Sequence, residues 1–316
     1  MGYSNGGESI SEALEGILTR EEIRELIRLL FADDIGMFSK TRGDMQKKLT
    51  EMNDVFSKYG LEISAGKTKY QKIGRQENEP MINLKLPQGK IEQVIDFTYL
   101  GGVISDDGRS DRDIENRVSV ANSNMRDFRK YFFSKKVTRK RKFRVLKTFF
   151  LGVVTYGCET WTLTVANKRK LDVWWMKQLR KCYGVTKKDK VRNEKILKHF
   201  NTDKLSNIIE KRRWDYYGHI YRYPDSRWAN FMLTAEPENP KRGLLTNWRK
   251  QIDSAKRDAA RILEERAPAR EFTDALASDK KLWAGLMKDI QVGRTAPNDI
   301  PEDLSISGGS QTEDEV

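Results

Sequence analysis

The stretch from Leu26 to Lys40 contains two short apolar runs joined through adjacent acids, Asp33 and Asp34. Apolar runs on either side of a turn-forming pair are typical of a tight β-hairpin, which would present both carboxylates together at its tip. Between Thr41 and Tyr59 the apolar positions instead recur at the spacing of an α-helix, which Gly60 is well suited to end. The pattern predicts a hairpin followed by a helix that packs against it.

Further strands are predicted before residue 108. The runs Met81–Leu86 and Lys90–Val94 lie on either side of a Pro-Gln-Gly turn, and Phe97–Ser105 reads as another strand. After Arg109 the pattern becomes helical, beginning with a stripe from Ile114 to Phe132. The sequence therefore predicts an α+β protein, with a small antiparallel sheet and a packed helix followed by a mostly helical region.

The helical pattern continues to residue 292. Apolar and aromatic positions recur at helical spacing in four further segments, Lys168–Tyr183, Leu205–Tyr223, Thr246–Glu265 and Glu271–Val292. Residues 297–316 carry six acids and no Lys or Arg, and we expect this tail to be disordered.

The charge of the chain indicates an anionic partner. The formal net charge is +13, and leaving out the six acids of the tail raises it to +19 for the first 296 residues. Lysines and arginines gathered on one face bind phosphate backbones by releasing counterions. We therefore expect RNA and DNA as partners, bound through the backbone without sequence preference.

The densest basic run lies between residues 135 and 147, where eight of thirteen residues are Lys or Arg and none is acidic. A solvated helix face would usually mix both signs, so this run predicts a phosphate-binding surface. A nuclear import signal is a second, compatible use. The predicted nucleic-acid contacts are Lys135, Lys136, Arg139, Lys140, Arg141, Lys142, Arg144 and Lys147.

A second basic segment, residues 212–222, interleaves Arg212, Arg213 and Arg222 with aromatic residues. Aromatic rings beside guanidinium groups can stack bases and bind a single strand. The aromatic positions also follow a helical stripe, so core packing is the alternative for most of them. We include the three arginines among the predicted nucleic-acid contacts.

Cysteine content and hydropathy indicate the compartment. Cys158 and Cys182 are the two cysteines, too few for a disulfide framework. The longest uncharged apolar run, Thr148–Cys158, is too short to span a bilayer, and the N-terminus lacks an apolar signal region. We expect an intracellular protein of the nucleus or cytoplasm that is not secreted and contacts no membrane.

Several blocks, taken in order, carry a family resemblance. FADDI (31–35), GLEISAGKTK (60–69) and YLGGVIS (99–105) are followed by YGCETWTL (156–163), RNEKIL (192–197) and RRWDYYGHIYR (212–222). At these separations the set resembles the reverse transcriptases of non-LTR (LINE-like) retrotransposons, from the end of the palm through the thumb to the downstream blocks. The resemblance implies RNA-directed DNA polymerase chemistry.

The resemblance also implies roles for single residues. Asp33 and Asp34 would be the catalytic pair that holds Mg²⁺, although adjacent aspartates are also common in simple turns. Lys67 would lie near the incoming triphosphate, with a solvated loop lysine as the alternative. Tyr99, Leu100 and Gly101 would grip the primer strand.

The predicted layout has five parts. Residues 1–25 are poorly determined, 26–108 form a partial palm, 109–236 form the thumb and C-terminal block, 237–296 form a charged helical extension, and 297–316 form the acidic tail. No aspartate precedes Asp33, although the family takes a further catalytic aspartate and its fingers from upstream. We therefore expect an N-terminally truncated, transposon-derived chain that is inactive as a polymerase alone. The alternatives are a non-catalytic nucleic-acid-binding protein and a functionless relic.

Overall fold

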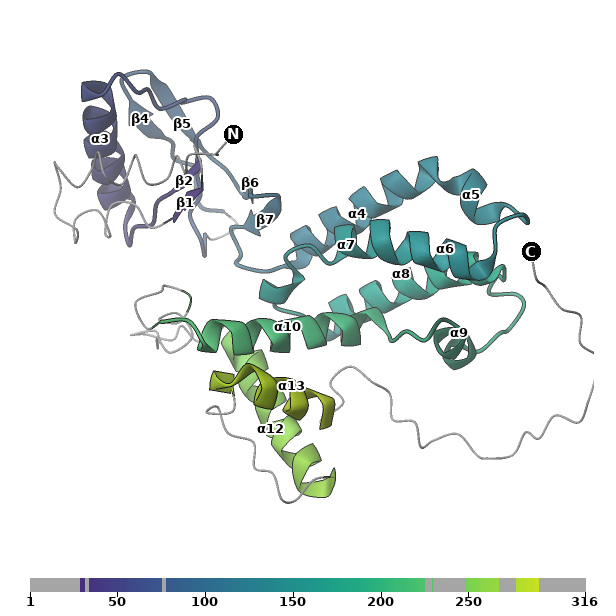
Figure 1. Cartoon of the computed structure of the whole chain (residues 1–316). Coiled ribbons are helices and arrows are strands. Elements are labelled where there is room, and N and C mark those ends of the chain that lie inside the picture. Colours follow the sequence, from purple (N-terminus) through teal and green to yellow (C-terminus); the bar gives the residue numbers. More distant parts are fainter. Residues whose placement is uncertain are drawn as a thin grey trace, which may run out of the picture. The chain divides into compact units, whose positions relative to one another are not determined.

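The computed structural model describes residues 29–31, 34–75, 78–224, 229, 248–266 and 277–289. Contacts divide the chain into two compact units, Met1–Gly108 and Arg109–Val316. In the part that is described, the first unit carries the strands beside one long helix, and the second is built from helices (Figure 1). Small sheets together with many helices confirm the predicted α+β class.

The first unit begins with the predicted hairpin. Strands β1 (Leu29–Phe31) and β2 (Asp34–Gly36) are antiparallel, with Leu30 opposite Ile35 and Phe31 opposite Asp34. The two residues between the strands, Ala32 and Asp33, lie outside the described residues. Asp34 therefore stands at the first position of β2, beside the turn, and the predicted hairpin is confirmed.

Helix α3 (Arg42–Lys58) follows, as its apolar spacing predicts. The Thr41 side chain accepts a hydrogen bond from the Asp44 amide at 3.1 Å, which satisfies one of the free amides of the first turn. Gly60 takes a φ of +72° just after the helix, a conformation that glycine adopts without steric cost. Buried Leu49 and Met52 belong to the core of this unit, whose other buried members are Ile63, Tyr70, Leu84, Leu86 and Ile91.

A three-stranded sheet supplies the rest of that core. β5 (Gly89–Gln93) is its central strand, with β3 (Lys69–Tyr70) parallel to it on one side and β4 (Leu84–Leu86) antiparallel on the other. Along β4 and β5 the side chains alternate between buried and exposed positions, because successive side chains of a strand point to opposite faces. The predicted hairpin around the Pro-Gln-Gly turn is confirmed.

The single strand predicted over Phe97–Ser105 is wrong, because the structure folds this segment into a hairpin. β6 (Asp96–Tyr99) and β7 (Gly102–Ser105) are antiparallel, with Tyr99 opposite Gly102. The two residues between them, Leu100 and Gly101, have φ values of +47° and +84°. Two successive residues with positive φ are characteristic of the tight turns that join hairpin strands.

The second unit is helical. Its main core combines Ile114 and Ala121 of the first helix with Trp175, Leu179 and Ile209 of later helices. Across the described part of the chain, no helix has both the length and the apolar character needed to cross a membrane. The helices are α4 (Asp111–Asp127), α5 (Arg129–Phe133), α6 (Arg139–Val145), α7 (Gly152–Val154), α8 (Val165–Tyr183), α9 (Asn193–Phe200), α10 (Leu205–Tyr221), α12 (Trp248–Arg266) and α13 (Lys280–Asp289), with a π-helical turn η1 (Leu146–Leu151) and a 3-10 turn η2 (Cys158–Thr160).

α6, η1 and α7 form one continuous helical rod. The residues at the two junctions, Val145, Leu146, Leu151 and Gly152, all have right-handed helical φ and ψ values. The Thr138 side chain caps the rod by accepting a hydrogen bond from the Arg141 amide at 3.4 Å. The basic run predicted from the sequence therefore lies mostly on the first half of this rod.

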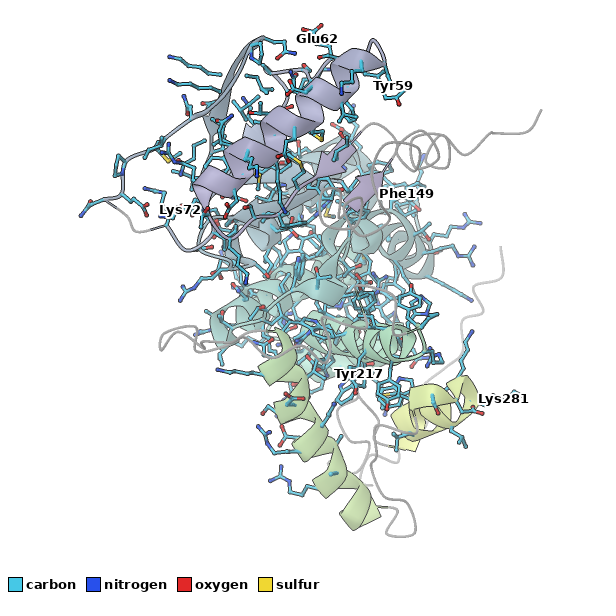
Figure 2. The ribbon with its side chains drawn as sticks, turned by 90° about the vertical axis from the view of Figure 1, so that its left-hand side faces the viewer. Tyr59, Glu62, Lys72, Phe149, Tyr217 and Lys281 are labelled. Atoms are coloured by element: carbon cyan, nitrogen blue, oxygen red, sulfur yellow. The ribbon has the colours of Figure 1, made fainter. Side chains whose placement is uncertain are left out.

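A second core joins α10 to the two C-terminal helices. Trp214 and Tyr217 of α10 pack with Ile252 of α12 and with Trp283 of α13. Figure 2 shows Tyr217 between α12 and α13. A Cβ atom on Gly218 would lie 2.4 Å from Nε1 of Trp283, so only glycine allows this close approach. The aromatic residues of α10 therefore serve largely as core, the alternative that the helical stripe offered.

Candidate functional site

The structure describes one residue of the predicted catalytic pair, Asp34. Asp34 is exposed at the start of β2, whereas Asp33 lies outside the described residues. Among the described residues, no three His, Cys, Asp or Glu side chains lie close enough together to hold a metal ion. Mg²⁺ prefers six oxygen ligands, and one carboxylate supplies at most two of them. The described side chains therefore do not form a magnesium site by themselves.

Electrostatics connect Asp34 with the predicted primer-binding strand. Partial burial, and after it the negative charge of Asp34, raises the pKa of the Tyr99 phenol. The hairpin of β1 and β2 and the strand β6 are thus close enough for one side chain to act on the other. Asp34 of the FADDI block therefore lies within electrostatic range of Tyr99 in the YLGG block.

The other two predicted primer contacts, Leu100 and Gly101, form the turn after Tyr99. Leu100 is partly exposed and takes a φ of +47°, a backbone conformation that is unfavourable for residues with a Cβ atom. Strained backbone of this kind clusters at functional sites. The strain lies immediately beside the residue whose phenol is influenced by Asp34.

Lys67, predicted to lie near the triphosphate, is exposed in the turn that follows α3. Its backbone amide donates to the carbonyl of Ser64 at 3.2 Å. Its ammonium forms no ion pair with a described carboxylate. The structure therefore leaves this lysine available, and it provides no contact that joins Lys67 to Asp34.

The basic run is mostly exposed, as a phosphate-binding surface requires. Seven of its eight cations are exposed, and none of these seven forms an ion pair with a carboxylate of the described residues. Arg139 lies over the ring of Tyr183, with its guanidinium carbon 4.3 Å from the ring centroid. The seven are Lys135, Lys136, Arg139, Lys140, Arg141, Arg144 and Lys147, here called the basic face.

The prediction that Lys142 contacts nucleic acid is corrected by the structure. Its side chain is 7% exposed, on the inner side of α6. Its charge acts on Cys182, whose pKa is raised to about 12 by burial against the opposing effects of Lys142 and Lys181. Because the rod packs on α8 along this side, Lys142 cannot reach a phosphate without leaving the core.

The three arginines predicted on residues 212–222 are used in internal contacts. Arg213 is 1% exposed and pairs with Glu210 at 3.1 Å. Arg212 donates to the Thr155 carbonyl at 3.2 Å, and Arg222 donates to the Ala277 carbonyl at 2.9 Å. The prediction of a nucleic-acid surface is corrected most clearly at Arg213, since α10 lies between the main core and the C-terminal helices.

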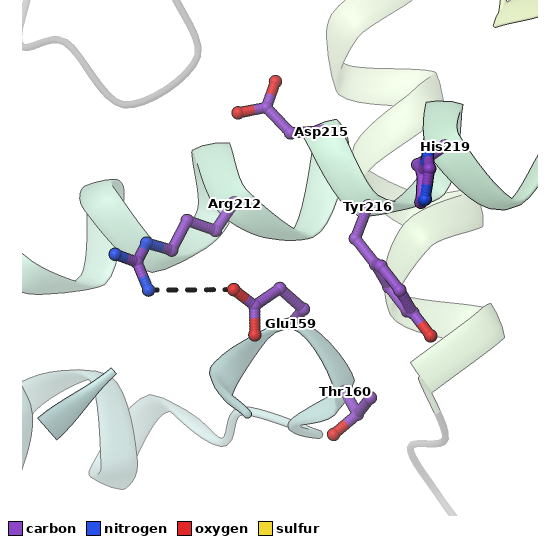
Figure 3. A pocket seen from close by; sticks show the side chains of 6 residues that line it. All are labelled: Glu159, Thr160, Arg212, Asp215, Tyr216 and His219. Carbon is purple, nitrogen blue, oxygen red and sulfur yellow. Dashed lines mark ion pairs between the residues drawn. The ribbon is translucent and has the colours of Figure 1, made fainter. Parts of the chain in front are cut away.

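α10 and η2 instead form an open pocket of about 400 Å³ that the sequence did not reveal (Figure 3). Glu159 of η2 pairs with Arg212 of α10 at 3.7 Å across its base. Partial burial raises the pKa of the Asp215 carboxyl, with the charge of Lys211 acting in the opposite direction. The pocket is lined by Glu159, Thr160, Arg212, Asp215, Tyr216 and His219.

The pocket brings together donors and acceptors from two distant blocks. His219 is within hydrogen-bond distance of the Tyr223 hydroxyl, at 2.9 Å from Nε2, and burial raises the pKa of Tyr216. A carboxylate, a phenol and an imidazole around one depression can bind a polar ligand. The signal in the sequence was the pair of blocks YGCETWTL and RRWDYYGHIYR, which the fold makes neighbours.

Comparison with known proteins gives one extended similarity. No protein-family model matches the chain, and no solved structure matches it. The chain is 26% identical over 279 residues to an uncharacterized transposon-derived protein of Caenorhabditis elegans. The alignment covers 84% of this chain and 96% of that protein, so the similarity extends through both units.

Proposed function

We propose that this chain derives from a non-LTR retrotransposon and that its first unit is the end of a reverse-transcriptase palm. The second unit would be the thumb and downstream region, which holds nucleic acid. Two independent findings support this. The ordered blocks span residues 31–222, and the similarity to a transposon-derived protein covers 84% of this chain.

The observation that carries the proposal is the ordered set of blocks between residues 31 and 222, and the electrostatic influence of Asp34 on Tyr99, two residues that are far apart in the sequence, agrees with it. In a polymerase the acidic pair must stand beside the strand that grips the primer, because the primer end reacts at the ions that the acids hold. Palm ancestry requires these two blocks to share one site. If the FADDI block were an ordinary surface turn, there would be no reason for it to lie near the YLGG block.

The residues would divide the chemistry among them. Asp34, together with Asp33, would hold Mg²⁺, which stabilises the charge that develops at a phosphate during displacement. Tyr99 and the strained turn after it would position the primer, and Lys67 would neutralise charge on the triphosphate. No aspartate precedes Asp33 in the chain, so we expect no polymerisation by these 316 residues alone.

Primer extension tests the catalytic part. The chain is incubated with a primed homopolymer RNA template, the matching deoxynucleotide and Mg²⁺, beside the Asp34→Asn variant. We expect no incorporation by either protein. Incorporation that the variant abolishes would contradict the expected inactivity, while establishing the polymerase assignment directly.

A second function, non-catalytic nucleic-acid binding, is favoured by the basic face. Its seven cations are exposed, and between Asp127 and Glu159 the chain contains no Asp or Glu that could compete with phosphate for them. Each phosphate neutralised by a cation releases counterions, which makes the affinity fall steeply as salt rises. We propose that this face holds the backbone of RNA or DNA without sequence preference.

The salt dependence of binding tests this function. Replacing Arg141, Arg144 and Lys147 by Gln removes three exposed cations from the basic face. The slope of log affinity against log salt should become shallower by about 2 to 3, at roughly 0.7 to 0.9 per phosphate contact.

A matched variant separates local contact from net charge. Lys187, Lys188 and Lys195 are also exposed in the second unit, and replacing them by Gln removes the same charge elsewhere. We expect this control to keep the wild-type salt slope. Equal slopes for all three proteins would contradict the proposed binding function.

A further inference from the structure

The rod of α6, η1 and α7 presents an exposed aromatic ring beyond the basic face. Phe149 is 58% exposed, although the residues directly after it, Phe150 and Leu151, are buried. Its ring centroid lies 6.2 Å from that of Phe128, which is 37% exposed. Phe128 is itself fixed by an edge contact of 5.4 Å with Phe150. One ring of the pair is therefore anchored in the core, and the other projects into solvent.

Phe149 lies in the π-helical turn η1, on the side that faces away from the core. η1 buries Leu146 and Phe150, and the three positions between them, Lys147, Thr148 and Phe149, are exposed. Positions four apart lie on nearly the same side of a helix, so the three residues between two buried ones project outward. π-helical turns are rare and are frequent at functional sites. The turn thus places an aromatic ring next to the basic face.

Charge identifies the partner that suits this surface. Lys147 lies two residues before Phe149, and Arg129 and Lys130 directly follow Phe128. Cations from two separate segments therefore stand next to the rings in sequence, with one acid, Asp127, directly before Phe128. A surface of cations around aromatic rings is complementary to single-stranded nucleic acid, in which phosphates alternate with unpaired bases.

The rod continues the same surface past the ring pair. Gly152 is exposed, and a Cβ atom at this position would meet no atom within 4 Å. Tyr156, at the end of the rod, is 52% exposed and lies under the guanidinium of Arg117 at 4.4 Å. The stretch from Lys140 to Val154, the last residue of α7, spans about 21 Å at 1.5 Å per residue.

We propose that Phe128 and Phe149 form a base-stacking platform for single-stranded nucleic acid, next to the basic face that holds its backbone. The inference rests on the proposed nucleic-acid binding and gives it a strand preference. A length of about 21 Å accommodates up to roughly six nucleotides at 3.4 Å each, within the site sizes of single-strand binding proteins. Paired bases of a duplex cannot reach the rings, so the platform acts on single strands alone.

The substitution Phe149→Ala tests the platform directly. Affinities are measured by fluorescence anisotropy for a single-stranded 12-mer and for a duplex of the same length. We expect about tenfold weaker binding of the single strand, since stacking contributes about 1 to 3 kcal/mol per base. The affinity for the duplex and the salt slope should stay unchanged, because the variant removes no charge.

Further variants distinguish stacking from simple apolar contact. Phe149→Trp should keep the single-strand affinity, whereas Phe149→Leu should lose it as Phe149→Ala does. A 12-mer carrying 2-aminopurine should be quenched by the wild-type protein and less by Phe149→Ala. Tyr59, labelled with Phe149 in Figure 2, is 52% exposed in the first unit, and Tyr59→Ala should leave single-strand binding unchanged.

The outcomes separate the inference from the proposed function. If the charge variant Arg141, Arg144 and Lys147→Gln binds weakly while Phe149→Ala binds as the wild type does, the platform is wrong and the binding function stands. If the charge variant also binds as the wild type does, the proposed function fails. If Phe149→Leu keeps full affinity, stacking is wrong.

Discussion

α6 and α10 contain similar residues, and the structure treats them in opposite ways. Both helices are rich in Lys or Arg and carry aromatic residues, and both were predicted to bind nucleic acid from their composition. α6 exposes its cations on one face, whereas α10 is covered by α8 and η2 and by the C-terminal helices. The same residue types are surface in one helix and interior in the other.

The difference can be traced to acids in the surrounding sequence. Arg212 and Arg213 of α10 each have a carboxylate partner, Glu159 for the first and Glu210 for the second. The segment that contains α6 has no acid between Asp127 and Glu159. Burying a cation without a paired charge is costly, which favours exposure of a basic run that has no nearby acids. Seven of the eight cations of the run are exposed, and Lys142 is the exception.

The largest expected effect compares two helical glycines. Gly218 of α10 faces Trp283, and a Cβ atom would lie 2.4 Å from its Nε1, whereas Gly152 in the rod has open space. Gly218→Ala should lower the free energy of unfolding by about 3 kcal/mol through overpacking. Gly152→Ala should raise it by about 0.5 to 1 kcal/mol through helix propensity. Urea denaturation measures the free energy of unfolding of both variants. Equal changes for Gly218→Ala and Gly152→Ala would contradict the packing of α10 against α13.

The next comparison uses two arginines, one from each helix. Arg213→Ala leaves Glu210, which is itself largely buried, without its 3.1 Å partner. Lys168 lies 3.9 Å from the same carboxylate and compensates in part. We expect Arg213→Ala to cost about 2 kcal/mol, less than a fully buried pair would lose.

Arg141→Ala is the control for that change. Arg141 is exposed on α6 and has no described carboxylate partner, so its loss should change stability by less than about 0.5 kcal/mol. Thermal unfolding at one pH and salt concentration compares the two variants. A larger loss for Arg141→Ala would mean that α6, too, is covered.

The inner side of α6 gives a smaller, pH-dependent effect. Burial holds the pKa of Cys182 at about 12, while an unfolded thiol has the ordinary value of 9.0. Between these values the unfolded chain has lost a proton that the folded chain keeps, so stability falls as pH rises. The expected loss is about 1.4 kcal/mol per pH unit above pH 9.

Cys182→Ala isolates this contribution from the other groups that titrate at high pH. The variant is less stable than the wild type at pH 8, because a buried side chain is shortened. Its deficit should shrink by about 1.3 kcal/mol between pH 10 and pH 11, where the unfolded thiol is almost fully ionised. A deficit that stays constant over this range would place Cys182, and Lys142 beside it, in contact with water.

Local rules predicted the parts of this fold that depend on nearby residues. The hairpin before Lys40, the helix capped by Thr41 and the stripe of α4 beginning at Ile114 follow from patterns a few residues long. The turn at Leu100 could not be predicted in the same way, because leucine does not favour a positive φ. Tertiary contacts hold it there.

The candidate sites could be predicted from the sequence only in part, because they depend on contacts between distant segments. The family resemblance predicted that the FADDI and YLGG blocks share a site, and the structure places Asp34 within electrostatic range of Tyr99. The roles of these residues remain predictions. The pocket beside Asp215 depends on η2, and the covered state of α10 depends on α12 and α13; no local pattern reveals how these elements pack against α10. The exposure of Phe149 was not predicted, because the residue lies in the uncharged apolar run Thr148–Cys158, which favours a core position.

The smallest expected effect is a difference in stability between substitutions at two adjacent exposed cations of α6, Arg139 and Lys140. Arg139 lies over the ring of Tyr183 at 4.3 Å, a contact worth about 0.5 to 1 kcal/mol at an exposed site. Lys140 has no such ring contact. Arg139→Gln should therefore lower the free energy of unfolding by about 0.5 kcal/mol, whereas Lys140→Gln should leave it unchanged. Tyr183→Leu should remove the difference between the two variants, because the ring that Arg139 contacts is then absent.

The contrary result is an equal loss of stability for Lys140→Gln and Arg139→Gln. In that case general charge, rather than the contact with the Tyr183 ring, sets the stability of this face, and the basic face cannot be divided into cations held by a ring and cations that are not.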